Sequence, residues 1–179
     1  MEINGVAHLF LTVSNIEAAL PFYEKLLVFL GMKPVMKSEN FLYCVGGRTA
    51  VGVQQADAEH RGERFVQRRV GLHHVCFRAR EREDVDRVHE FAKELGATIV
   101  HPPESGNWAP GYYSVLFEDP DGIRLEVNFV PGKGLLAVCT SCTSEVISLP
   151  NRLVSSATPA TYRSAVATSS RPMGILDMV

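Results

Sequence analysis

Two histidines and one glutamate stand where they could bind a single metal ion. His8 and His74 occupy the same place in two similar strand patterns, 66 residues apart. Glu126 lies in a later strand pattern whose alternation places it on one face with Arg124 and Asn128. Two imidazoles and a carboxylate can hold a divalent cation while leaving coordination positions open. The three residues therefore predict a metal site suited to Lewis-acid chemistry on an oxygen-bearing substrate.

The elements that would position these side chains form an internal repeat. Each histidine lies in a strand pattern followed by a helical pattern that ends near a glycine, Gly31 or Gly96. These glycines are 65 residues apart, almost the spacing of the two histidines. Three further strand patterns follow each helix, so the unit β-α-β-β-β occurs twice. The expected segments are strands 7–13, 33–36, 41–45, 49–54, 73–79, 98–101, 112–118 and 123–129, and helices 15–31 and 83–96.

The chain divides by composition into a periodic part and a tail. We expect one domain over residues 3–134, with modules at 3–58 and 70–131 joined by a polar linker. From residue 135 to residue 179 the chain is rich in Ser, Thr, Ala and Val, and this predicts a low-complexity, irregular tail. The tail is expected to add nothing to the metal site.

Composition and charge exclude several classes of protein. The 179 residues carry a formal net charge of −2, which offers no general attraction to nucleic acid or to anionic membranes. No apolar run approaches the roughly 20 residues that a membrane helix needs. The start of the chain lacks a secretory signal pattern, and the four cysteines suggest reduced thiols. We therefore expect a cytoplasmic protein with neither a nucleic-acid nor a membrane partner.

These residues and repeats resemble the vicinal oxygen chelate superfamily, which includes glyoxalases, bleomycin-resistance proteins and extradiol dioxygenases. The resemblance covers about residues 5–131, and its most specific stretches are FYEKLLVFLGMKPV and GYYSVLFEDPDGIRLEVNF. It implies an α+β fold of two βαβββ modules, whose curved mixed sheets form a cup around a metal ion. It maps the metal ligands onto His8, His74 and Glu126, which do not distinguish manganese, iron, zinc, nickel or cobalt.

The resemblance implies a metal-dependent lyase or isomerase of the glyoxalase type. Its small-molecule substrate would be chelated through neighbouring oxygens, and the protein would form a homodimer. Many glyoxalase I members carry a fourth ligand, Glu or Gln, in the last strand of the first module. Here that slot holds Val51, Gly52 or Val53, so a site with three ligands fits the residues better.

Two alternatives stay open at this point. An extradiol-type dioxygenase would carry a tyrosine where this chain has Leu116, and a histidine between His101 and Glu126 that is absent here. A metal-free drug-binding module, like the bleomycin-resistance proteins, would usually lack the ligand set. Retention of both histidines and the glutamate favours an enzyme.

Further residues are candidates for roles around the metal. Glu126 and Tyr113 are expected to be catalytic, by moving a proton at the substrate. The candidates for substrate binding are two strand residues, one aromatic residue in a Gly/Pro loop and one tyrosine, namely Gln54, Arg124, Trp108 and Tyr112.

Overall fold

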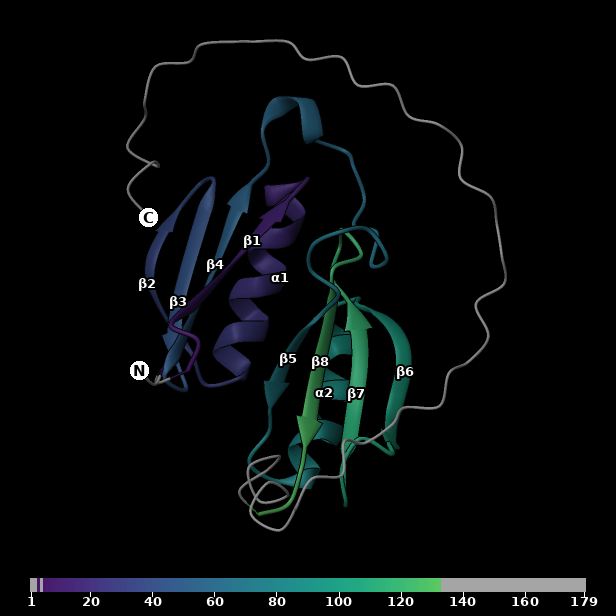
Figure 1. Ribbon diagram of the computed structural model, residues 1–179. Helices are drawn as coiled ribbons and strands as arrows, with labels where there is room; N and C mark the ends of the chain where they lie inside the picture. Colours follow the sequence, from purple (N-terminus) through teal and green to yellow (C-terminus); the bar gives the residue numbers. More distant parts are fainter. Residues whose placement is uncertain (1–2, 4, 133–179) are drawn as a thin grey trace, which may run out of the picture. The chain divides into compact units, whose positions relative to one another are not determined.

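The computed structural model of the protein describes residues 3 and 5–132. The tail predicted for residues 135–179 lies outside the described residues. Figure 1 shows the helices and strands in their order along the chain. They are β1 (His8–Val13), α1 (Ile16–Phe29), β2 (Lys33–Ser38), β3 (Phe41–Gly46), β4 (Thr49–Gln55), the 3-10 helix η1 (Ala58–His60), β5 (Val75–Arg78), α2 (Arg82–Glu94), β6 (Thr98–Ser105), β7 (Tyr113–Glu118) and β8 (Arg124–Phe129).

The first module is a four-stranded mixed sheet covered on one face by α1. The strand order is β1-β4-β3-β2, with β1 parallel to β4 and the other neighbours antiparallel. Alternate residues of β1 separate the two faces, because Leu11 and Val13 are buried while His8, Phe10 and Thr12 are exposed. His8 therefore lies on the open face of the first sheet.

The second module repeats this topology, as the sequence predicts. The order β5-β8-β7-β6 again has one parallel pair, β5 with β8, and α2 packs on the sheet. His8 is the first residue of β1, and His74 directly precedes β5. The expected α+β pair of βαβββ modules is confirmed.

The two helices end near the glycines that the sequence predicts, and α1 begins at a side-chain cap. Asn15 caps α1, where its side-chain oxygen accepts a hydrogen bond from the backbone of Ala18 at 3.2 Å. Gly31 and Gly96 follow the two helices with φ of 82° and 77°, a conformation that favours glycine. The two modules therefore end their helices with the same device.

Strand β6 is longer than the sequence predicts. It runs to Ser105 instead of ending at residue 101, and it passes through Pro102 and Pro103. The register against β7 shifts on both sides of His101. Proline has no backbone N–H to donate to a neighbouring strand. β6 is an edge strand with a single neighbour, where prolines are tolerated, and the irregular register accommodates them.

The two modules contact each other through the turn between β7 and β8. Tyr23 of α1 donates a hydrogen bond from its hydroxyl to Asp119 at 2.7 Å. The Ser14 hydroxyl donates to Asp121 at 2.6 Å. The rings of Phe29 and Phe91, one from each helix, stack with centroids 4.0 Å apart.

Neither helix of the described residues has the length and apolar character that a membrane span requires.

Candidate active site

The open face of the second sheet carries a cluster of polar side chains around Glu126. His74 Nε2 lies 3.1 Å from one carboxylate oxygen of Glu126. The Tyr112 hydroxyl donates a hydrogen bond to the other oxygen. The Asn128 amide in turn donates to the Tyr112 hydroxyl at 3.3 Å. The Glu126 side chain is only 13% exposed, so its partners fix its position.

Strand register brings these residues to one face. The parallel pairing of β5 with β8 sets Cys76 opposite Glu126 and Arg78 opposite Asn128. Because side chains alternate along a strand, residues two apart share a face. His74 precedes Cys76 by two positions, and its side chain reaches the Glu126 carboxylate. The cluster therefore follows from the alternation that the sequence already displays.

His73 holds the His74 ring from the side opposite Glu126. The Nδ1 atoms of the two histidines lie 2.7 Å apart, so they share one hydrogen bond. Gln67 of the linker lies 2.7 Å from His73 Nε2. Such contacts fix the orientation of a metal-binding imidazole, and they leave His74 Nε2 facing Glu126. Alternation along the strand turns His73 away from the site and predicts a surface or supporting position for it, and the structure shows the contact with His74.

The Tyr112 hydroxyl and the Cys76 thiol, which lie beside Glu126, keep their protons at neutral pH. Removal from water and the bond to Glu126 raise the pKa of Tyr112 to about 12. Desolvation, followed by the Glu126 charge, likewise raises the pKa of the Cys76 thiol to about 12. At neutral pH both groups remain protonated, so both can donate to the carboxylate. Sequence reasoning missed Cys76, although its spacing from His74 was the available signal.

The structure brings together two of the three predicted metal ligands. The imidazole of His74 and the carboxylate of Glu126 are ligand types that fit a divalent metal. His8 lies on the open face of the first sheet, where its ring meets Phe10 edge-on with centroids 5.5 Å apart. Across residues 3 and 5–132, no three His, Cys, Asp or Glu side chains gather as a metal site. The described residues of one chain therefore bring two candidate ligands together and leave His8 apart from them.

The slot for a fourth ligand is occupied by a glycine. Of the three sequence alternatives for this slot, Val51 and Val53 are fully buried, whereas Gly52 pairs with Phe10. A Cβ at Gly52 would lie 2.4 Å from the Phe10 ring, which covers the strand there. The ring needs a residue without a side chain beneath it, so this position holds no ligand.

Two of the predicted site residues make their contacts outside the cluster. Tyr113 points to the helix side of the sheet, where its hydroxyl donates to Asp86 of α2 at 2.8 Å. The Arg82 guanidinium lies 3.5 Å from the centre of the Tyr113 ring. Arg124 is held by Glu118 at 3.2 Å. The structure therefore brings Tyr112, and not Tyr113, to Glu126.

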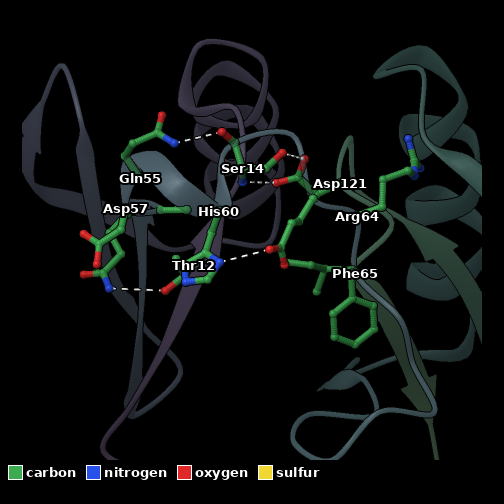
Figure 2. A pocket seen from close by; sticks show the side chains of 12 residues that line it. Thr12, Ser14, Gln55, Asp57, His60, Arg64, Phe65 and Asp121 are labelled. Atoms are coloured by element: carbon green, nitrogen blue, oxygen red, sulfur yellow. Dashed lines mark hydrogen bonds and ion pairs between the residues drawn. The ribbon is translucent and has the colours of Figure 1, made fainter. Parts of the chain in front are cut away.

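Gln54 lines a separate cavity of about 420 Å³, shown in Figure 2. Its amide donates to the Thr12 hydroxyl at 3.2 Å. The bonds from Ser14 to Asp121 close another side of this cavity. The lining includes none of the residues that contact Glu126. Gln54 is thus placed apart from the His74–Glu126 pair.

Trp108 lies in the loop between β6 and β7, with 68% of its surface exposed. A Cβ added at Gly106 would lie 2.9 Å from the Tyr112 ring and 3.1 Å from the Trp108 ring. The two aromatic residues therefore flank the same glycine. This places Trp108 close to the tyrosine that contacts Glu126.

Comparisons with known proteins identify the family. The sequence profile of the Glyoxalase/Bleomycin resistance protein/Dioxygenase superfamily matches residues 5–127. The chain belongs to this superfamily.

Individual relatives agree with this assignment. Uncharacterized protein YqjT of Bacillus subtilis is 31% identical over 67% of this chain and 94% of that protein. Metallothiol transferase FosB of Shouchella clausii is 28% identical, over 70% of this chain and 80% of its own length. Lactoylglutathione lyase from Agrobacterium tumefaciens superimposes with a TM-score of 0.52 and 25% identity, covering 72% of this chain and 96% of that one.

Proposed function

We propose that the protein is a divalent-metal-dependent enzyme of the glyoxalase type, a lyase or isomerase. Its substrate is a small molecule that offers two neighbouring oxygens to the metal. The observation that carries this proposal is the contact between His74 Nε2 and the Glu126 carboxylate, at 3.1 Å. Two of the relatives, a lactoylglutathione lyase and a metallothiol transferase, support an enzyme, and the second supports a metal.

The residues around Glu126 have separate roles in this proposal. A bound metal supplies Lewis-acid stabilisation of negative charge on the substrate oxygens. His74 and Glu126 hold the metal, and His73 keeps the His74 ring in place. The Glu126 oxygen that faces Tyr112 accepts a substrate proton, while the Tyr112 hydroxyl fixes that oxygen. Tyr112 takes the place that the sequence alone gave to Tyr113.

His8 completes the ligand set from a second copy of the chain. Two protein ligands hold a catalytic metal weakly, and three are the usual number. His8 lies on an open sheet face of its own module, apart from His74 and Glu126. A homodimer that sets the first sheet of one copy against the second sheet of the other would supply it. The protein then works as a dimer with two equivalent sites.

Metal content tests the proposed site. The purified protein is expected to retain about one divalent metal ion per chain, measured by plasma mass spectrometry. Glu126→Gln and His74→Ala are expected to lose it, because each removes one of three ligands. Glu118→Gln, a carboxylate change on the neighbouring strand, is the matched control. Equal metal affinity in Glu126→Gln and in the parent would overturn the metal site.

Mixed dimers test the origin of His8. A chain with His8→Ala and a chain with His74→Ala each lack one ligand at every site of their own homodimers. If the sites are shared between copies, a mixed dimer contains one site with all three ligands. We expect the mixed dimer, purified after co-expression of the two variants, to contain about half the metal content of the parent dimer. No recovery in the mixed dimer would place the three ligands within one chain.

A metal-free binding module is the second candidate function, and the face around His8 favours it. The rings of Phe10, Phe41 and Tyr43 lie on this face, with centroids 5.7 to 6.3 Å apart. Phe10 is 40% exposed, so an aromatic ligand could stack there. Binding of aromatic compounds by the chelator-treated protein, undiminished in Glu126→Gln, would favour this function over the enzyme.

We place the protein in the cytoplasm, where Cys44 and Cys76 would remain the free thiols that the structure contains. A small molecule is its partner in either function.

A further inference from the structure

A second cavity, of about 590 Å³, lies where the end of α1, the β3–β4 turn, β5 and the start of α2 meet. Its volume falls within the range of roughly 300–1,000 Å³ that is usual for small-molecule sites. Neither His74 nor Glu126 lines it, and the Figure 2 cavity has different lining residues. Cys76 and Arg78 do line it, so the cavity adjoins the Glu126 cluster on the same sheet, but its lining lacks both candidate metal ligands of this module.

Positive charge gathers in this cavity. Arg78, Arg80 and Arg87 line it, against a single carboxylate, Asp84. The whole chain is slightly acidic, so this excess is local. Guanidinium groups bind carboxylates and phosphates through paired, charge-assisted hydrogen bonds.

The three arginines differ in how far they are already engaged. Arg87 forms an ion pair with Asp84 at 3.1 Å. Arg78 donates a hydrogen bond from Nη2 to the Val130 carbonyl at 2.7 Å. Within the described residues, Arg80 makes no hydrogen bond or ion pair. The cavity therefore holds a free guanidinium beside two that keep unused donors.

Apolar side chains form the other wall of the cavity. Phe29, Leu30, Phe77 and Val88 line it, and Phe29 is 42% exposed. An exposed aromatic ring beside the free guanidinium group of Arg80 suits a ligand with one charged end and one apolar end. An inorganic anion would contact the arginines and leave the apolar wall uncovered.

We propose that this cavity binds a small anionic amphiphile, a carboxylate or phosphate attached to a short apolar chain. The anionic group binds Arg80 together with the free donors of Arg78 and Arg87. The apolar chain lies against Phe29 and Phe77. No metal takes part, so the proposal stands independently of the enzyme function.

Titration calorimetry on the full, chelator-treated chain tests this proposal with four probes. Hexanoate and hexyl phosphate carry both halves of the expected ligand, whereas 1-hexanol and inorganic phosphate carry one half each. We expect one or both of the anionic amphiphiles to bind at least about tenfold more tightly than either half. Raising the salt from about 50 to about 500 mM should weaken this binding. The stronger of the two amphiphiles identifies carboxylate or phosphate as the preferred group.

Matched charge variants locate the binding. Arg80→Gln is expected to weaken binding of the amphiphile about tenfold, because the free guanidinium is lost. Arg68→Gln removes the same charge from an exposed linker position and is expected to change nothing. Circular dichroism checks that both variants remain folded.

Several outcomes would overturn the proposal. Equal binding of hexanol and hexanoate would remove the role of charge, and equal binding of phosphate and hexyl phosphate would remove the role of the apolar wall. Equal losses in the two arginine variants would place the ligand elsewhere. If no probe binds while Arg80→Gln changes the sedimentation coefficient, a second copy of the chain covers the cavity.

Discussion

Tyr112 and Tyr113 are adjacent in the chain, yet their hydroxyls bond to different elements. Tyr112 donates to Glu126 on the open face of the sheet, and Tyr113 donates to Asp86 on α2. Removing the Tyr112 hydroxyl frees a proposed metal ligand, so Tyr112→Phe should weaken metal binding roughly tenfold. Tyr113→Phe should leave the metal affinity unchanged and lower the free energy of unfolding by about 1 kcal/mol. Competition with a chelating dye measures the first quantity, and urea unfolding the second.

Gly52 shows how a missing side chain shapes the face around His8. A Cβ there would overlap the Phe10 ring, with a closest approach of 2.4 Å. Gly52→Ala should therefore lower the free energy of unfolding by roughly 1–3 kcal/mol. In a chain that already carries Phe10→Ala, the same change should cost much less. A double-mutant cycle by urea unfolding measures the difference, and equal costs in both backgrounds would contradict this account.

In the β7–β8 turn, protonation of one buried carboxyl group, Asp119, is coupled to the stability of the fold. Asp119 is buried and accepts hydrogen bonds from Tyr23 and from the backbone of Asp121 and Ile123. Burial outweighs these bonds and raises the pKa of Asp119 to about 6. The folded protein therefore holds this proton more tightly than the unfolded chain does. Its contribution to stability is present below about pH 4 and is lost as the pH rises to about 6.

Asp119→Asn should remove this pH dependence. Between about pH 4 and about pH 6, the stability of the parent relative to the variant should fall by at most about 3 kcal/mol. Above that window the difference should stay constant. Urea unfolding at several pH values measures it, with the exposed Glu39→Gln as control. A parallel pH profile in parent and Asp119→Asn would contradict the assignment.

At the scale of the whole molecule, we expect residues 3–134 to fold without the C-terminal segment. The basis is the change in composition near Leu135. A chain truncated after Lys133 should keep its metal content and its melting temperature. Calorimetry and metal analysis of the two lengths test this, and a melting temperature lower by several degrees would assign the segment a structural role.

Much of the architecture was determined by the sequence alone. Strand alternation and the spacing of His8, His74, Gly31 and Gly96 predicted two equivalent modules, because local periodicity reflects which face each element buries. The same alternation placed Glu126 and Asn128 on one face, and the register of β5 with β8 agrees. The predicted length of β6 was wrong. Prolines end most strands, and this favoured an early end, but they are tolerated in a strand at a sheet edge.

Only the tertiary structure decided which of these residues meet. The pattern of residues 112–118 did not distinguish the two tyrosines, whereas folding sends one to Glu126 and the other to α2. The bonds from Tyr23 and Ser14 to the Asp-Pro-Asp-Gly turn join residues about a hundred positions apart. The same holds for the three arginines and the apolar wall, which come from α1, β5, α2 and the loop between β5 and α2. Such contacts depend on how modules pack, and a local pattern carries no information about that packing.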